Sequence, residues 1–175
     1  GGTGIQSSSS DPISMCITGK YGSQNTPALV TCGHGGNMKD KAVKMGGSNI
    51  GTFKKVNFQN NCYGDYAIAT LNSGYSQYKY VRGNGVLRAV SGLRRSIPSG
   101  AAVARYGNET HYDHGYVGIT NMTITYEDDP YLGDVTVKGL TTMSFTNGIA
   151  ESGDSGGCVY TNDSGATNVV GIISG

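Results

Sequence analysis

Short apolar runs separated by glycine, asparagine and other turn residues fill the chain, and this pattern predicts β-strands throughout. The expected strands cover residues 13–18, 28–31, 42–45, 50–56, 66–71, 101–106, 116–126, 134–145, 158–160 and 169–174. Apolar and polar residues alternate along 116–126, with an irregularity expected at Asn121. No segment shows a strong helical periodicity. Residues 83–100 have a mixed pattern and are expected to connect two β halves.

The composition agrees with a turn-rich all-β chain. Glycine accounts for 29 of the 175 residues, whereas charged residues make up only 14% and tryptophan is absent. The formal net charge is +1 and no basic stripe or acidic run is present, so neither nucleic acid nor an anionic membrane is an expected partner. No apolar run is long enough to span a membrane as a helix.

Metal chemistry has little support in the sequence. The four cysteines contain no C-x-x-C pair, which argues against a zinc knuckle, and if all were bridged they would allow three pairings. His111 and His114 lie close together in a polar segment, but a full set of four ligands is not evident around them. We therefore predict neither a metal nor a cofactor.

Three short motifs carry candidate chemistry. The sequence GDSGG at 153–157 places a serine between glycines, TCGH at 31–34 ends in a histidine, and GDYA at 64–67 holds an aspartate before an apolar run. Along the chain the order is histidine, aspartate, serine. This is the order of a chymotrypsin-type triad, and not that of subtilisins or α/β-hydrolases. The order indicates acyl transfer with water as the final acceptor.

Each residue of the three motifs has an expected role in such a triad. Ser155 is the nucleophile, His34 the general base, and Asp65 the carboxylate that fixes the histidine tautomer. The N–H groups of Gly153 and Ser155 are the expected donors of an oxyanion hole. Each motif alone has a plainer interpretation: a glycine–serine turn, an exposed histidine, or a charge at the end of a strand. Together, and in this order, they favour the catalytic interpretation.

On these motifs the chain resembles the secreted bacterial serine proteases of the chymotrypsin superfamily, in the branch of the streptogrisins and α-lytic protease. The segments that carry the resemblance are residues 16–34, 60–67, 102–107, 151–157 and 170–175. The resemblance implies an extracellular serine endopeptidase that acts on polypeptides through an acyl-enzyme. It also implies protein inhibitors or the enzyme's own pro-segment as further partners. The alternatives are a catalytically silent binding module on the same fold and an ester hydrolase.

The resemblance also implies the fold and the division of the chain. We expect two packed, six-stranded antiparallel Greek-key barrels, as in trypsin. Residues 1–84 would form the barrel with the histidine and the aspartate, 85–100 the connection, and 101–175 the barrel with the serine. The family continues past the position of Gly175, so the second barrel is expected to lack its carboxyl-terminal part.

Further site residues follow from the same resemblance. Arg105 is expected to pair with Asp154 and so to hold the oxyanion loop. Residues of the primary specificity pocket and of the substrate-pairing strand are expected to be Asn147, Gly148, Ile149, Ala150, Ile173, Ser174 and Gly175. None of them is acidic, which argues against a preference for arginine or lysine. Ile173 stands where glutamate-specific members have a histidine, so the expected preference is for an apolar side chain at P1, the substrate residue before the scissile bond.

The cysteines depart from the family pattern. Gly35 follows the histidine where the branch usually has a cysteine, and Ile149 replaces the usual cysteine before the nucleophile loop. We consider a disulfide between Cys16 and Cys32, across the hairpin that ends at the histidine, if the register brings the two together. Cys62 and Cys158 receive no pairing from the sequence, and both are candidates for free thiols.

Overall fold

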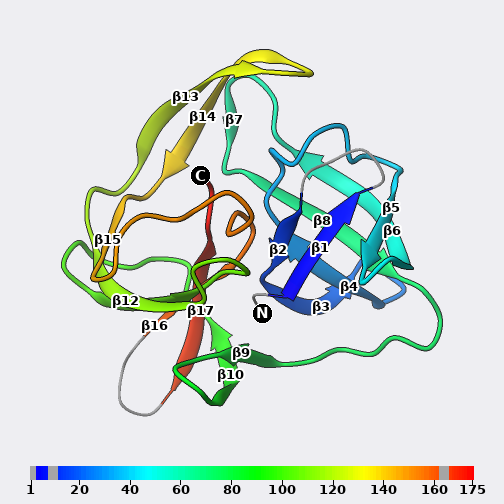
Figure 1. The fold of residues 1–175 in the computed structure, drawn as a ribbon, viewed down its shortest axis with the longest axis horizontal. Helices are drawn as coiled ribbons and strands as arrows, with labels where there is room; N and C mark the ends of the chain where they lie inside the picture. The colour runs from blue at the N-terminus through cyan, green and yellow to red at the C-terminus, as the bar shows by residue number, and fades with distance from the viewer. Residues whose placement is uncertain (1–2, 8–11, 162–165) are drawn as a thin grey trace.

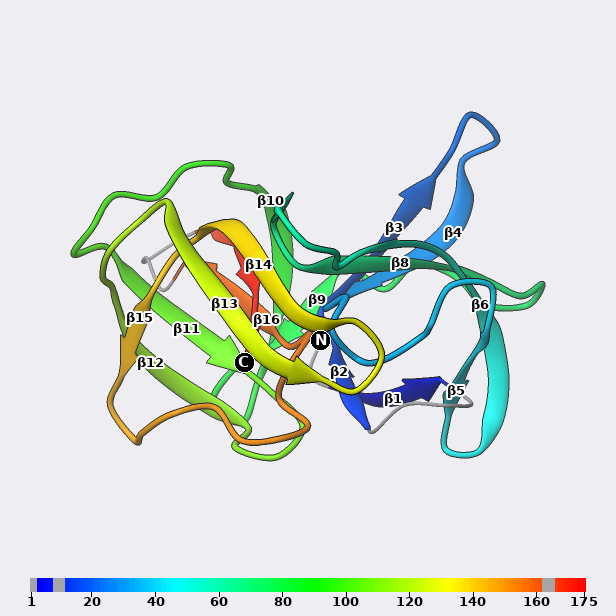
Figure 2. The ribbon, with the colours of Figure 1, turned by 90° about the horizontal axis from the view of Figure 1, so that it is seen from above.

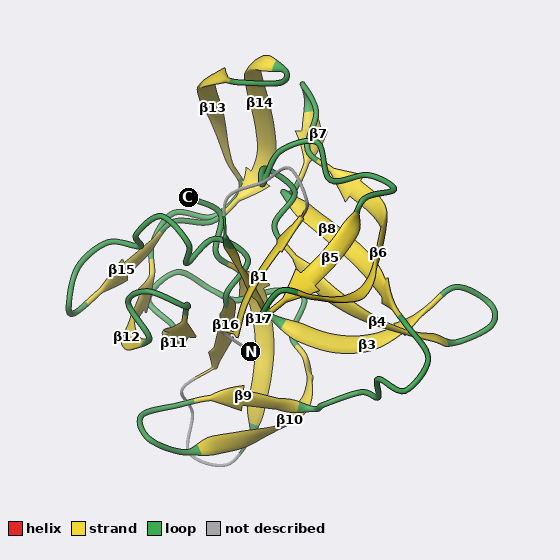
Figure 3. Cartoon of the chain, turned by 45° about the vertical axis from the view of Figure 1, so that its right-hand side comes forward, coloured by secondary structure: helices red, strands yellow, loops and turns green. Residues whose placement is uncertain are grey.

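The chain folds almost entirely into strands and the turns between them. A computed structural model describes residues 3–7, 12–161 and 166–175. In these ranges it contains 17 strands and no helix (Figure 3), so the all-β prediction is confirmed. Consequently, no described segment is a helix long and apolar enough to cross a membrane.

The first half is a closed barrel that holds the histidine and aspartate motifs (Figure 1). Its strands are β1 (Thr3–Ser7), β2 (Ile13–Met15), β3 (Ile17–Tyr21), β4 (Thr26–Thr31), β5 (Ala42–Met45), β6 (Ser48–Asn57) and β8 (Tyr66–Leu71). Their order in the sheet is β2-β1-β5-β6-β8-β4-β3. Because β2 and β3 are one chain segment interrupted only at Cys16, the sheet begins and ends with the same segment and closes. Counted that way, the barrel has the six strands that were expected.

The second half is built on a curved sheet that carries the serine motif. Its strands are β9 (Tyr80–Arg82), β10 (Leu87–Leu93), β11 (Ala102–Tyr106), β12 (Tyr112–Val117), β15 (Met143–Phe145), β16 (Cys158–Thr161) and β17 (Thr167–Ile172). Their order is β15-β12-β11-β16-β17-β10-β9, and the pair β10–β17 is parallel. Among the described residues no hydrogen-bonded pair joins β15 to β9, so this sheet stays open.

A long hairpin connects the second half to the first. It consists of β13 (Met122–Asp129) and β14 (Gly133–Leu140), and β14 pairs in parallel with the short strand β7 (Cys62–Tyr63) of the first half. Figures 1 and 2 show the two halves side by side, and Figure 1 shows this hairpin reaching toward β7. The hairpin thereby approaches the aspartate motif, which directly follows β7.

Buried side chains form separate clusters within and between the halves. The first barrel encloses Ile5, Ile13, Leu29, Cys32, Met38, Val43, Ile50, Phe53, Ala67 and Ala69. A second cluster contains Cys16 of the first half together with Cys158 and Tyr160 of the second. Burying one large apolar side chain such as Phe53 contributes on the order of 2 kcal/mol, so these clusters stabilise each half and the contact between them.

Several strand boundaries differ from those expected. The run 116–126 is divided between β12 and β13, because Asn121 takes a positive φ of 58° that ends the extended backbone. The connection 83–100 contains a strand, β10, and β1, β7 and β9 were not expected. The division of the chain into 1–84, 85–100 and 101–175 stays a prediction, although β9 hydrogen-bonds into the second sheet.

Candidate active site

Asp65 holds His34 through both oxygens of its carboxylate. The aspartate lies between β7 and β8 and is buried, whereas His34 follows β4 and is partly exposed. Asp65 Oδ1 accepts hydrogen bonds from the backbone N–H groups of Gly33, at 2.5 Å, and His34, at 3.0 Å. Asp65 Oδ2 contacts His34 Nδ1. Because a carboxylate only accepts, Nδ1 carries the proton and Nε2 is left as the basic nitrogen.

The turn that carries Ser155 is fixed against the first barrel by two hydrogen bonds from Ser14. The Ser14 N–H donates to the Ser155 carbonyl at 2.7 Å, and the Ser14 hydroxyl donates to the Gly153 carbonyl at 2.7 Å. Gly156 has a φ of +87°, and a Cβ there would lie 2.1 Å from Thr31 Oγ1 and 2.3 Å from the Ser14 carbonyl oxygen. Only glycine fits this position. The first half thus approaches the turn so closely that a side chain at position 156 has no room.

Two N–H groups beside the serine are free to bind an anion. Within residues 3–7, 12–161 and 166–175, the N–H groups of Gly153 and Ser155 donate no hydrogen bond. The neighbouring N–H groups are used: that of Asp154 donates to Glu151, and that of Gly156 to Ile173. Gly153 takes a φ of +103°, which glycine adopts without strain. This arrangement is suitable for an oxyanion hole.

His34, Gly153 and Ser155 line one cavity of about 460 Å³. The wall also includes residues of both halves and of the β13–β14 turn, namely Gln6, Ser7, Pro12, Ile13, Gly35, Gly36, Asp129, Pro130, Tyr131 and Ser152. In the described part of the chain the Ser155 hydroxyl makes no hydrogen bond, to His34 or to any other residue. The structure thus brings the predicted base, nucleophile and oxyanion donors to a single cavity, with the base and its carboxylate already in contact.

Arg105 does not pair with Asp154, contrary to our expectation. Arg105 and Asp113 face each other across the β11–β12 pair, and their side chains form a buried ion pair with 3.7 Å between Nη2 and Oδ2. The same Nη2 donates to the carbonyls of Gly148, at 3.3 Å, and Ile149, at 3.1 Å. Side chains directly opposite each other on antiparallel strands are close neighbours, which explains why Arg105 pairs with Asp113 and not with Asp154. Arg105 therefore supports the segment before the serine through its carbonyls.

Asp154 takes its partners from a neighbouring loop. Its Oδ1 accepts from the N–H groups of Glu109, at 2.9 Å, and Thr110, at 3.0 Å, and its Oδ2 accepts from the Thr110 hydroxyl at 2.6 Å and the Glu151 N–H at 3.0 Å. Burial alone would raise the pKa of Asp154. The hydrogen bonds, of which that from the Thr110 hydroxyl is the largest, outweigh burial and hold this pKa below its usual value. The carboxylate is satisfied without an arginine.

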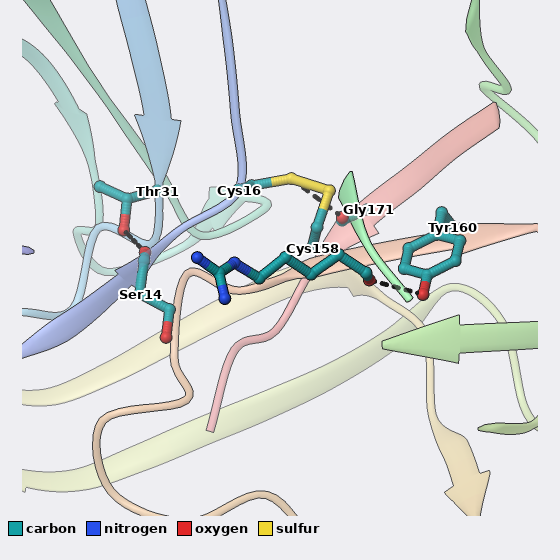
Figure 4. Close-up of a disulfide and its surroundings, with 7 residues drawn as sticks. Ser14, Cys16, Thr31, Cys158, Tyr160 and Gly171 are labelled. Atoms are coloured by element: carbon teal, nitrogen blue, oxygen red, sulfur yellow. Dashed lines mark hydrogen bonds between the residues drawn. A yellow bond between two sulfur atoms is a disulfide. The ribbon is translucent and has the colours of Figure 1, made fainter. Parts of the chain in front are cut away.

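The disulfide joins Cys16 to Cys158, so the proposed bridge between Cys16 and Cys32 is wrong. The register of β3 and β4 explains the error: Ile17 pairs with Val30, which puts Cys16 near Thr31 and not opposite Cys32. Cys16 instead lies with Cys158 in the cluster between the halves, where their Cα atoms are 4.2 Å apart (Figure 4). The bridge links the barrel that holds His34 to the strand that follows Ser155.

The two free cysteines are both buried. Burial raises the pKa of the Cys32 thiol, and the negative charge of Asp65 adds to the shift. Cys32 is therefore a neutral thiol in the core of the first barrel, although it lies only two residues before His34. Cys62 packs where the β13–β14 hairpin meets the first half, beside Val135 and Val137.

Most residues expected in the specificity pocket line a second cavity, of about 940 Å³. Those present are Gly148, Ile149, Ala150, Ile173, Ser174 and Gly175, and their apolar neighbours include Phe145 and Val159. Asn147 is not in this wall, because its side-chain amide and backbone N–H both donate to Asp113, each at 3.0 Å. Apart from Asp65, no carboxylate of the described residues lines the cavity.

Sequence reasoning missed the side chains of Tyr126 and Phe58, and it missed the contact of Ser174 with Asp65. The Ser174 hydroxyl donates to Asp65 Oδ2 at 2.6 Å, a contact beyond its expected pairing with substrate. The ring of Tyr126 stacks on the His34 ring, with centroids 5.7 Å apart and 24° between planes. Phe58 packs against both rings in T-shaped arrangements. No local signal identifies them, since each comes from a segment distant in sequence.

His111 and His114, for which the sequence predicted no metal site, each stack on a tyrosine. His111 stacks on Tyr106, with centroids 5.7 Å apart, and His114 stacks on Tyr112, with centroids 6.1 Å apart. In the portion of the chain that the structure describes, no three histidine, cysteine, aspartate or glutamate side chains gather as metal ligands.

Comparison with known proteins gives the same fold. No family model matches the chain. Among solved structures, Nocardiopsis protease is similar at a TM-score of 0.80 and 28% identity, over 100% of this chain and 82% of that one. Thermobifida fusca protease A is similar at a TM-score of 0.79 and 27% identity, over 100% of this chain and 82% of that one. A third similar structure is that of a glutamic acid specific serine protease, described as using a histidine triad in substrate binding. Its TM-score is 0.80 and its identity 26%, over 100% of this chain and 84% of that one. The resemblance to bacterial chymotrypsin-like serine proteases is therefore confirmed, and it supports a protease function.

Proposed function

We propose that the chain is a secreted serine endopeptidase that hydrolyses polypeptides through an acyl-enzyme on Ser155. The observation that carries the proposal is the contact of His34 Nδ1 with the buried carboxylate of Asp65, at a cavity that His34 and Ser155 both line. The structural similarity to bacterial serine proteases supports a hydrolase with peptide substrates.

The proposed reaction begins with attack of Ser155 Oγ on the scissile carbonyl carbon. His34 Nε2 accepts the Ser155 proton, and Asp65 stabilises the imidazolium that results. Catalytic hydrogen bonds often tighten only when substrate binds, so we expect the bond between Ser155 and His34 in the substrate complex. His34 then returns the proton to the leaving amine. Water, deprotonated by the same histidine, then attacks the acyl carbon; the bond to Ser155 Oγ breaks, and the histidine returns the proton to Ser155 Oγ.

The negative oxygen of the tetrahedral intermediate requires donors that need no rearrangement. The free N–H groups of Gly153 and Ser155 suit this role, because both residues lie in the cavity that holds the base. Losing one such donor typically lowers kcat by a factor of about 10² to 10³. The substrate backbone would add to the chain as a short antiparallel strand along Ser174.

We further propose a preference for apolar side chains at P1. The second cavity offers Ala150, Val159 and Ile173 as apolar wall. Three arginines, Arg94, Arg95 and Arg105, also line this cavity, and the buried charge of Arg105 is matched by Asp113 and by two carbonyls. The only lining carboxylate among the described residues, Asp65, is bonded to His34 and Ser174, which leaves none to attract arginine or lysine. Peptides that differ only at P1 test this: leucine and phenylalanine should be cleaved faster than lysine and glutamate.

Secretion is supported by the disulfide between Cys16 and Cys158. Bridges of this kind form and persist in oxidising compartments and are rare where thiols are kept reduced. The bridge also agrees with the resemblance to secreted proteases on which the proposal began.

A fluorophosphonate probe tests the proposed nucleophile directly. Incubation of the folded protein should add the phosphonyl group to one serine, and peptide mapping by mass spectrometry should place it on Ser155. Ser155→Ala should abolish the adduct. Ser152→Ala is the matched control, because Ser152 lines the same cavity but lies outside the proposed triad, and it should label like the parent protein. An adduct on another residue would exclude Ser155 as the nucleophile. No adduct on the folded protein would favour a binding module on this fold.

A further inference from the structure

His34 and three side chains near it form a closed ring of contacts. His34 contacts Asp65, Asp65 accepts from Ser174, Ser174 contacts Tyr126, and Tyr126 stacks on His34. Tyr126 belongs to β13, in the hairpin that the second half extends toward β7. Its hydroxyl lies within hydrogen-bond reach of Ser174 Oγ and 3.1 Å from the Ser174 carbonyl oxygen.

The directions of the hydrogen bonds in this ring follow from proton counting. Asp65 Oδ2 only accepts, so the single hydroxyl proton of Ser174 points at it across 2.6 Å. Ser174 Oγ has no second proton, so it accepts from Tyr126, whose single hydroxyl proton is shared between Ser174 Oγ and the Ser174 carbonyl oxygen. The chain therefore runs from the Tyr126 hydroxyl to the Ser174 hydroxyl to the Asp65 carboxylate, which also accepts from His34 Nδ1. Hydrogen bonds in such chains polarise and strengthen one another.

We propose that Tyr126 is a positioning residue that sets the basicity of His34 through Ser174 and Asp65. This inference rests on the proposed function, because His34 matters to catalysis only as the general base. The Tyr126 hydroxyl makes the Ser174 hydroxyl a stronger donor, so more of the Asp65 charge is neutralised by Ser174. Less of that charge then stabilises the His34 imidazolium. Removing the Tyr126 hydroxyl therefore raises the pKa of His34.

The other titratable groups near His34 stay the same in this comparison. Cys32 lies two residues before it and is neutral in the barrel core. Asp129 and Tyr131, from the turn of the same hairpin, line the cavity that His34 faces. The Tyr126 ring is retained in Tyr126→Phe, so its stacking on His34 is also kept. A change in the His34 pKa can then be assigned to the missing hydroxyl.

The experiment is an NMR titration of the folded full chain labelled at histidine. The His34 signal is assigned by its loss in His34→Ala, and His111 and His114 serve as internal references. We expect Tyr126→Phe to raise the His34 pKa by about 0.3 unit, a fraction of one charge-assisted hydrogen bond. Ser174→Ala should raise it further. Tyr116→Phe is the matched control, because Tyr116 is 61% exposed and lies away from the site, and it should leave the His34 pKa unchanged.

The double variant separates the relay from a general effect on packing. If the hydroxyl acts through Ser174, Tyr126→Phe should shift nothing in the Ser174→Ala background. An unchanged His34 pKa in Tyr126→Phe, or an equal shift in both backgrounds, would overturn the inference. Because the titration needs no substrate, its result stands apart from the fluorophosphonate test of Ser155. If that test succeeds, the acid limb of kcat/KM should move to higher pH by the same amount in Tyr126→Phe.

Discussion

The bridge between Cys16 and Cys158 offers the sharpest test of how the two halves are held together. Cys16 follows Ser14 by two residues, and the Ser14 N–H donates to the carbonyl of Ser155, three residues before Cys158. Replacing both cysteines, in Cys16→Ala with Cys158→Ala, removes the cross-link and leaves the main-chain bond. We expect a large loss in the free energy of unfolding.

The size of the loss follows from the length of chain that the bridge closes. Cys16 and Cys158 are separated by 142 residues. In the chain-entropy model, a loop of this length restricts the unfolded chain by about 5 kcal/mol, and native bridges removed from small domains typically cost about 2–5 kcal/mol. Total stabilities are about 5–15 kcal/mol, so the variant is expected to be close to the limit of folding at 25 °C.

Urea unfolding at equilibrium measures the difference, with non-reducing peptide mapping to verify the bridge in the parent protein. The matched control is Cys32→Ala with Cys62→Ala, which also removes two buried sulfurs but no cross-link. The bridge variant should be less stable than this control by at least about 2 kcal/mol. A difference below about 1 kcal/mol would refute the reasoning, because the closed loop would then contribute nothing measurable.

Three further predictions concern the site and its supports. Gly156→Ala should lower the free energy of unfolding in urea by about 3 kcal/mol, because it adds backbone strain and a Cβ 2.1 Å from a neighbouring oxygen. Gly74→Ala, with positive φ but open space around it, should lower it by about 1 kcal/mol. Equal losses in the two variants would argue against the clash. Asp154 has a lowered folded-state pKa, so its contribution is present above the unfolded pKa of about 3.9 and is lost as pH falls through the folded value. Thr110→Val should therefore destabilise by about 1–2 kcal/mol at pH 7 and progressively less below pH 4, and a loss that is constant with pH would contradict this. Because Cys32 is buried and the pKa of its thiol is raised, iodoacetamide at pH 8 should alkylate it only after urea unfolds the chain. Rapid alkylation of Cys32 in the folded protein would exclude a buried neutral thiol.

What could be predicted from the sequence is what short segments encode. Alternation and turn residues indicate strands, which is why the all-β class is correct. The three motifs are contiguous, and each places one side chain beside a strand end or in a tight turn. Gly33 illustrates the point, because its N–H donates to Asp65 from the residue next to His34. Recognition of the motif order required no knowledge of the distances between them.

The errors and omissions concern contacts whose partners depend on register or on distant segments. Arg105 pairs with Asp113 because the β11–β12 register puts them opposite each other, and that register is not readable from either strand alone. The partner of Cys16 was missed for the same reason, since the offset of β3 against β4 directs it away from Cys32. Tyr126 approaches His34 only because β14 pairs with β7.

These unpredicted contacts have one physical consequence for the proposed chemistry. Asp65 and His34 belong to the first half, whereas Ser155 and Ser174 belong to the second, so no single half contains the reaction centre. Bonds across the junction, including the one from the Ser14 N–H to the Ser155 carbonyl, therefore fix the position of the nucleophile relative to the base. Misplacement by about 1 Å can cost on the order of 10² in rate. The motifs alone thus indicate which chemistry is encoded, but whether it occurs at a useful rate depends on the packing of the two halves.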